Sequence, residues 1–147
     1  MILFCDTSAL VKLYVKEEFS DEARALADSA KAIAVSRISW AETMATLARR
    51  VRESPADAEA IEVIRSNFRT DWPSFAIIEV TQALVELAGD YADTFALRGY
   101  DSIQLAAARV LQEATSEAFC FACFDARLQK SASVLGMQTL GKQRGGS

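Results

Sequence analysis

The stretch ILFCDTSALVKLYVKE, residues 2–17, begins with four apolar residues that are followed at once by an acid, Asp6. A short apolar run that ends in a polar turn is typical of a buried strand, and apolar residues then recur every three or four positions, as in a helix. We therefore expect a strand over residues 2–5 and a helix over residues 8–17. Asp6 marks their junction.

The same alternation of strand and helix patterns continues to the end of the chain. Further strands are predicted at 32–35, 75–80, 118–124 and 137–140, and further helices at 20–30, 39–53, 54–68, 81–99, 101–114 and 125–136. Such alternation favours an α/β fold in which helices cover both faces of a central, mostly parallel sheet. We expect a single domain over residues 1–140, with a flexible C-terminal tail over 141–147.

The composition excludes several classes of chemistry. The chain has no histidine, which excludes Ser-His and Cys-His nucleophile pairs and His-ligated zinc. The net charge of -4 provides no long-range attraction for nucleic acid, so any such contact must be local. Cys5, Cys120 and Cys123 all lie in apolar runs, as expected of reduced thiols in the cytoplasm, and no apolar run has the length of a membrane span.

Four acids fall at junctions where strands end or helices begin. They are Asp6, Glu42, Asp101 and Asp125. Sites in parallel sheets form at the carboxyl ends of the strands, so all four could face one edge. Each acid also has a simpler interpretation, because Asp is favoured at helix N-caps and Glu42 follows Ser39 at the spacing of a capping box. Gln104 likewise follows Asp101 at a box-like spacing.

Capping alone does not explain why Asp6 and Asp125 adjoin the most apolar segments without an obvious cationic partner. Arg98 and Arg127 are near in sequence, but we expect them on different faces. Carboxylates that gather within a few ångströms repel one another unless a cation neutralises them. Oxygen ligands alone favour Mg²⁺ or Mn²⁺, which can activate water for phosphodiester hydrolysis.

The motifs around these acids resemble those of the PIN-domain nucleases, and in particular the VapC-type toxins of type II toxin-antitoxin pairs. The stretches that carry the resemblance are ILFCDTSALVKLY, SWAETMATLARR, LRGYDSIQLAAA and CFACFDARLQKSASVLG. The resemblance spans nearly the whole chain. It implies a PIN-like three-layer α/β/α fold, a Mg²⁺- or Mn²⁺-dependent endoribonuclease that hydrolyses RNA, a homodimer, and inhibition by a cognate antitoxin protein.

Residue by residue, the resemblance assigns the catalytic and metal-binding positions to Asp6, Glu42, Asp101 and Asp125. It places supporting side chains beside the site at Thr7, Ser8 and Gln104. Two positions depart from the family pattern: Gln104 stands where a His is common, and Cys123 where Thr or Ser is common. Neither is a metal ligand in that pattern, so we expect activity to survive with altered hydrogen bonding around the site.

Further predictions concern RNA contacts, other functions and the antitoxin surface. Arg49, on the Glu42 face of its helix, and Lys12 are candidate RNA contacts, although Arg49 fits a solvated helix end equally well. Aspartyl phosphotransfer enzymes fit poorly, since they need a second acid where Ser8 stands. A catalytically inactive PIN-like module that binds RNA or a protein is the main alternative. We also expect the first two helices to bind the antitoxin, because the segment around Val11 and Val15 has more apolar residues than one buried stripe requires.

Overall fold

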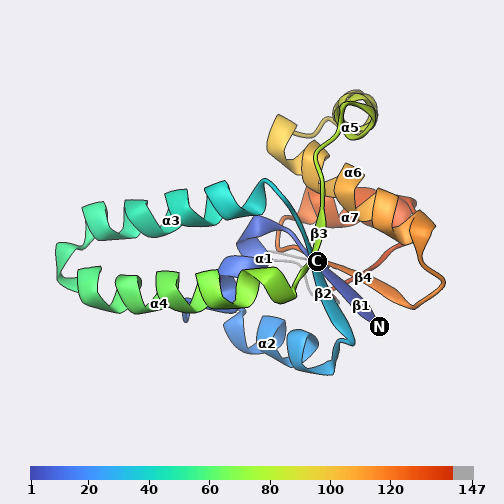
Figure 1. The fold of residues 1–147 in the computed structure, drawn as a ribbon. Helices are drawn as coiled ribbons and strands as arrows, with labels where there is room; N and C mark the ends of the chain where they lie inside the picture. Colours follow the sequence, from blue (N-terminus) through green and yellow to red (C-terminus); the bar gives the residue numbers. More distant parts are fainter. Residues whose placement is uncertain (141–147) are drawn as a thin grey trace.

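The computed structural model describes residues 1–140, and a five-stranded parallel sheet forms its centre (Figure 1). The strands are β1 (Ile2–Cys5), β2 (Ala32–Ser36), β3 (Ala76–Ile78), β4 (Phe119–Ala122) and β5 (Gln138–Thr139), in the spatial order β3-β2-β1-β4-β5. Every neighbouring pair is parallel. The tail expected at 141–147 lies outside the described residues.

The helices between the strands complete the three-layer α/β/α fold that the sequence predicted. They are α1 (Thr7–Lys12), α2 (Ser20–Ser29), α3 (Ser39–Glu53), α4 (Ala58–Asp71), α5 (Gln82–Phe95), α6 (Gly99–Ala114) and α7 (Ala126–Val134), with 3₁₀ turns η1 (Pro55–Asp57) and η2 (Trp72–Ser74). No helix within the described residues is both long enough and apolar enough to cross a membrane.

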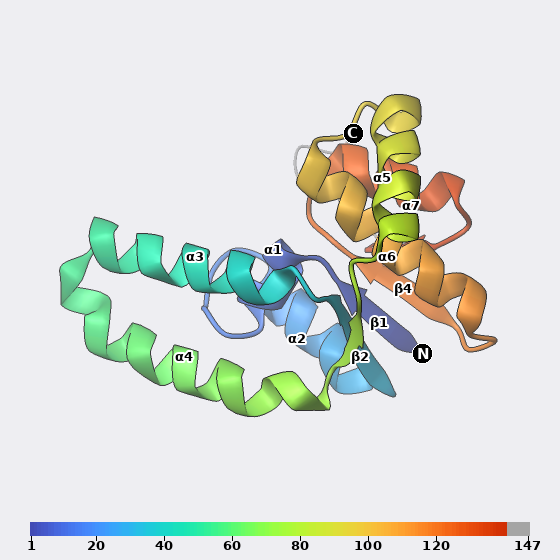
Figure 2. The same cartoon turned by 45° about the horizontal axis from the view of Figure 1, so that its top comes forward.

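The central strand β1 is buried from both sides, and this sets the two layers of helices. Successive strand residues point to opposite faces of a sheet. Leu3 and Cys5 pack in a core with α1 and the aromatic residues of α4 and η2. Phe4 packs in a second core with α5, α6 and α7, where its ring stacks on Phe121 of β4. Figure 2 shows α1–α4 and α5–α7 as two separate groups beside the strands.

The antiparallel helices α3 and α4 extend beyond the sheet as a long hairpin (Figures 1 and 2). A small core holds the hairpin against the rest of the chain, and in it Val11 and Val15 pack with Leu47 of α3 and Ile61 of α4. Val11 and Val15 are therefore buried within their own chain. These valines are therefore not surplus apolar residues available to an antitoxin, as the sequence predicted, because the hairpin covers them.

Some predicted boundaries also differ from the structure. The first helix ends at Lys12 instead of residue 17, and the Ser20 hydroxyl at the start of α2 donates to the carbonyl of Val15 and accepts from the amide of Glu17. The predicted helix 81–99 ends at Phe95, as α5. The chain leaves α5 through Ala96 in the left-handed conformation, φ 54°, and Gly99 begins α6 instead of closing the helix before it.

Candidate active site

Asp6 lies directly after β1 at the carboxyl end of the sheet, and its side chain caps α1. Its Oδ1 accepts hydrogen bonds from the Ala9 amide at 2.9 Å and from the Ser8 hydroxyl at 2.8 Å. Within the described residues no hydrogen bond reaches Oδ2. One oxygen of Asp6 is therefore fixed by the helix, while the other remains available for a ligand.

The environment of Asp6 disfavours its negative charge. Only 6% of the residue is exposed, and burial raises the pKa of its carboxyl to about 7 from the usual 3.8. The hydrogen bonds from Ala9 and Ser8 oppose this shift, and the nearby charges of Asp101 and Glu42 add to it. A bound cation would relieve both the burial penalty and the repulsion between acids.

Glu42 is held by a polar network that joins three helices. Its Oε1 accepts from the Thr7 hydroxyl at 2.9 Å, and the Gln104 amide nitrogen lies 3.0 Å from the same oxygen. Gln104 Nε2 also lies within hydrogen-bonding distance of Thr7 Oγ1 and Ser39 Oγ. The capping-box interpretation of Glu42 was wrong: α3 begins without a side-chain cap, and the glutamate faces α1 and α6.

Gln104 likewise takes no part in a cap of α6, whose start has no side-chain cap at all. It is 2% exposed, and its amide nitrogen is positioned by the α1–α3 network. Ser39, which the sequence suggested only as a cap, belongs to the same network through its 3.0 Å contact with Thr7. The sequence signal for the role of Ser39 in this network was its position three residues before Glu42, in the same helix turn.

Asp101 and Asp125 line one hollow of about 430 Å³ at the N-terminal ends of α6 and α7. Asp125 Oδ1 caps α7 by accepting from the Leu128 amide at 2.9 Å, so capping and exposure of the second oxygen coexist here as they do at Asp6. Burial raises the pKa of Asp101, Asp125 adds to the rise, and Arg98 opposes it. Arg98 and Arg127 line the same hollow, which corrects the expectation that they lie on different faces.

Three of the acids interact electrostatically with one buried thiol. In addition to burial, the charges of Asp6, Asp125 and Asp101 each raise the pKa of Cys123, which lies in the link between β4 and α7. Asp6 in turn interacts electrostatically with Glu42 and Asp101. Asp6 and Asp125 follow the neighbouring parallel strands β1 and β4, and Glu42 and Asp101 lie in the first turns of α3 and α6, so the carboxyl edge of the sheet is common to the acids.

The donor set fits a hard divalent cation, although it is not a closed cage. Among residues 1–140, no three His, Cys, Asp or Glu side chains are close enough to hold a metal ion together. Mg²⁺ does not require three, because it usually keeps several waters and takes one or two carboxylates together with substrate phosphates. Carboxylate oxygens without a partner, in a site where burial and repulsion penalise their charge, match that preference.

The two predicted RNA contacts are both engaged in ion pairs. Lys12 Nζ lies 3.0 Å from Glu17 and 4.9 Å from the centre of the Phe124 ring, and its side chain is only 13% exposed. Arg49 pairs with Glu53 one turn along the exposed face of α3. Neither role in RNA binding is tested by this geometry, and both stay predictions.

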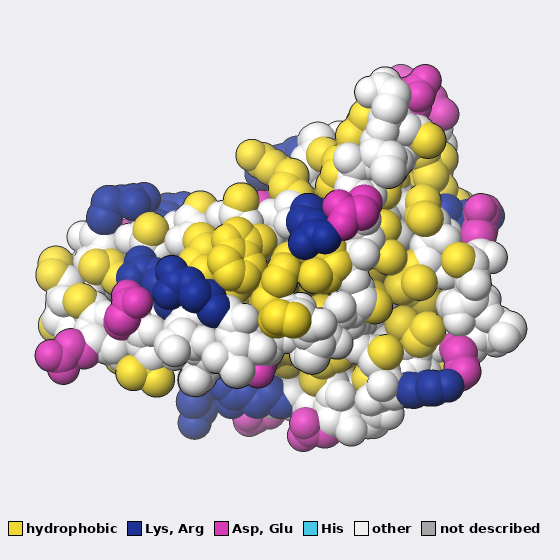
Figure 3. Space-filling view, viewed as in Figure 1, with side chains coloured by type: hydrophobic (Ala, Val, Ile, Leu, Met, Phe, Trp, Pro, Cys, Tyr) yellow, Lys and Arg dark blue, Asp and Glu magenta, His cyan; other side chains and the backbone are white. Residues whose placement is uncertain are grey.

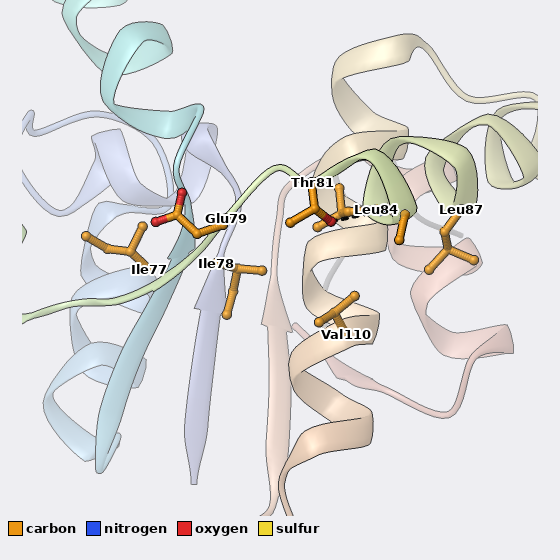
Figure 4. Close-up of a pocket in the computed structure, with 8 residues that line it drawn as sticks. Ile77, Ile78, Glu79, Thr81, Leu84, Leu87 and Val110 are labelled. Atoms are coloured by element: carbon orange, nitrogen blue, oxygen red, sulfur yellow. Dashed lines mark hydrogen bonds between the residues drawn. The ribbon is translucent and has the colours of Figure 1, made fainter.

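A second hollow lies between β3 and the helices α5 and α6, and its walls are largely apolar. Figure 3 shows hydrophobic side chains gathered where β3 passes between the α3–α4 hairpin and α5. In Figure 4, Ile78 faces Val110 across this hollow, with Leu84 and Leu87 beside them. Its one acid, Glu79, is paired with Arg37. It therefore lacks the unpartnered carboxylates that distinguish the hollow at Asp101.

Comparison with known proteins shows the family of the chain. A family model of the PIN domain matches residues 3–132. The chain belongs to the PIN-domain family. It is 30% identical over 135 residues to a protein named Ribonuclease VapC45 from Mycobacterium tuberculosis (strain CDC 1551 / Oshkosh), with 92% of each chain covered.

Solved structures share the PIN fold at lower identity. A toxin-antitoxin complex from Klebsiella pneumoniae matches with a TM-score of 0.67 and 19% identity, over 98% of this chain and all of that one. FitAcB from Neisseria gonorrhoeae matches with a TM-score of 0.64 and 16% identity, over 96% of this chain and 97% of that one. At these identities the likeness shows the fold.

The raised pKa of Asp6 predicts that ionisation of this site carboxyl lowers the stability of the PIN domain. An acid whose pKa is higher in the folded state costs stability once it ionises, so the metal-free protein should lose stability as pH rises from about 4 through about 7. Asp6→Asn keeps the oxygen that caps α1 and removes the charge. We expect it to raise the free energy of unfolding near pH 8 by a few kcal/mol, and to have little effect near pH 4.

Thermal and urea denaturation in the presence of a chelator measure this gain. Asp28→Asn, an exposed acid on α2, is the matched control and should change stability by less than about 0.5 kcal/mol at either pH. A loss of stability in Asp6→Asn at about pH 8 would show that the carboxylate is needed as a structural cap.

Proposed function

We propose that this protein is a Mg²⁺- or Mn²⁺-dependent endoribonuclease that acts as the toxin of a toxin-antitoxin pair. The observation that supports the proposal is the hydrogen bonding of the four acids. Asp6, Glu42 and Asp125 each have one oxygen held by a protein donor and a second that no donor within residues 1–140 reaches, and Asp101 accepts no hydrogen bond there. A relative with 30% identity is named a ribonuclease.

Each side chain has a defined task in this proposal. Asp6 and Asp101 would hold the ion, with Glu42 and Asp125 at its periphery. When bound, the ion supplies a polarised water and neutralises charge on the phosphodiester. Thr7 and Gln104 keep the Glu42 carboxylate turned toward the site, and Ser8 and the α1 amide keep Asp6 from rotating away. No histidine is available as a general base, so the acids and the ion must act together.

Hydrolysis of RNA distinguishes this function from an inactive module that only binds RNA or protein. We expect the wild type to cleave a defined single-stranded RNA with Mg²⁺ or Mn²⁺, and to stop when a chelator is added. Asp101→Asn should lower kcat/KM by roughly a hundredfold or more, because a ligand charge is lost. Asp93→Asn, an exposed acid on α5, should not change it.

Two outcomes of this experiment would count against the proposal. Undiminished cleavage by Asp101→Asn would contradict the site, and binding without cleavage of any RNA by the wild type would favour the inactive module.

The Glu42 network gives a matched pair of threonine variants. Thr7→Val removes the hydroxyl that donates to Glu42, and we expect about a 10- to 100-fold loss of activity. Thr43 lies on α3 beside Glu42, and its buried hydroxyl has no partner among the described residues. Thr43→Val should leave kcat/KM unchanged and should not lower the melting temperature. Equal losses in the two variants would show a packing effect instead of a role for the Thr7 hydroxyl.

The antitoxin partner is the second half of the proposal. The solved neighbours with this fold include a toxin-antitoxin complex. With Val11 and Val15 buried, the candidate surface at α1 and α2 is a hollow of about 430 Å³, whose walls include Leu13, Arg24 and Phe75. Its mixture of apolar and charged walls suits an amphipathic segment of a partner protein.

Hydrogen exchange with and without the antitoxin encoded beside this chain tests that surface. We expect slower exchange across residues 9–30 in the complex, and unchanged protection there would refute it. The homodimer belongs to the same proposal and is measured by light scattering, with a monomer at every concentration as the contrary result. Three buried, free cysteines agree with action in a reducing cytoplasm.

A further inference from the structure

An acidic site that binds RNA needs nearby lysines or arginines that are not already neutralised in ion pairs. Most lysines and arginines among residues 1–140 are bound to a carboxylate. Those in ion pairs are Lys12, Lys31, Arg37, Arg49, Arg50, Arg65, Arg69 and Arg109. Arg98, Arg127 and Lys130 form no ion pair within the described residues, and all three are exposed.

These three cations lie around the site. Arg98 and Arg127 line the hollow that holds Asp101 and Asp125, and Arg127 also lines the adjacent hollow with Lys130, one turn further along α7. Arg127 is steadied by a hydrogen bond from Nη1 to the carbonyl of Ala96. The other lysines and arginines without an ion pair among residues 1–140 are on the α1–α2 segment and on α3: Lys16, Arg24 and Arg52.

The backbone beside Arg98 adds donors to the same rim. The amides of Gly99, Tyr100 and Asp101 donate no hydrogen bond within the described part of the chain, since α6 starts without a side-chain cap. Free amides and the positive end of a helix dipole favour an anion. Together with two unpaired guanidinium groups, they give the acidic hollow a cationic edge.

We propose that Arg98, Arg127 and Lys130 bind the phosphates of single-stranded RNA on either side of the bond that the acids cleave. The inference rests on the proposed ribonuclease function and names the residues that hold its substrate. Because the whole molecule carries a net charge of -4, local cations must offset the repulsion between the acids and RNA. Arginine suits this task, since its planar guanidinium can bond two phosphate oxygens at once.

Exposed aromatic surface beside the rim favours a single strand over a duplex. The aromatic side chains Tyr14, Trp40 and Trp72 pack around Phe68 and are not free to stack on bases. Tyr100, next to Asp101, is 61% exposed. Unpaired bases stack on such rings, whereas bases in a duplex are stacked on one another. Tyr100 therefore completes the rim as a stacking platform.

RNA binding measured apart from cleavage tests the rim. The probe is a labelled single-stranded oligoribonucleotide of mixed sequence, titrated with the full chain in a chelator and followed by fluorescence anisotropy at several salt concentrations. Arg98→Ala and Arg127→Ala should each weaken binding roughly tenfold and reduce the slope of log K against log salt by about 0.7. Tyr100→Ala should weaken it about fivefold or more, and Tyr100→Phe should not.

Arg52→Ala, an exposed unpaired cation on α3, is the matched control and should leave both affinity and salt slope unchanged. Melting temperatures establish that each variant is folded. Cleavage by the wild type with unaltered affinity in Arg98→Ala and Arg127→Ala would overturn the rim and leave the ribonuclease standing. A duplex RNA bound as tightly as the single strand, with no effect of Tyr100→Ala, would overturn the single-strand preference. Failure of the wild type to cleave would reject the proposed function itself.

Discussion

The candidate site depends on one constraint: acids that repel one another are held by hydrogen bonds at the carboxyl edge of a parallel sheet. Asp6 is nearly inaccessible to water, and its charge is disfavoured by burial and by two other carboxylates. It does not turn away, because Oδ1 is bound to the α1 amide and to Ser8. Asp6 is thus fixed through Oδ1 by the helix that it caps. Its Oδ2, which no hydrogen bond within residues 1–140 reaches, is left to bind a ligand.

Two other acids of the site are also held through one of their two carboxylate oxygens. Asp125 caps α7 with one oxygen, and Glu42 is gripped through one oxygen by Thr7 and Gln104. Capping and ligand binding are therefore compatible interpretations of one side chain, since a carboxylate has two oxygens. Gln104 shows how the chain accommodates its departure from the family pattern: its amide donates to Glu42 from α6, although its own Oε1 has no partner within residues 1–140.

The sequence predicts what periodicity and local chemistry control, and misses what distant packing controls. The strand at residues 2–5 was correctly bounded because an apolar run ends abruptly at Asp6. The surface role of Val11 and Val15 was wrong because only the fold shows the α3–α4 hairpin over them. Arg98 and Arg127 were assigned to different faces, yet they meet because α6 and α7 begin at one hollow. The side-chain partners of Glu42 are 35 and 62 residues away, which no local pattern encodes.

We propose that these carboxylates form a divalent-cation site. Crystals grown or soaked with Mn²⁺ and measured by anomalous diffraction test this site most directly, because the signal locates the ion without reference to activity. We expect an anomalous peak within ligand distance of Asp6 Oδ2 and an Asp101 oxygen, about 2.2 Å from each. A peak elsewhere on the molecule, or none at saturating Mn²⁺ with the carboxylates in their present positions, would contradict it.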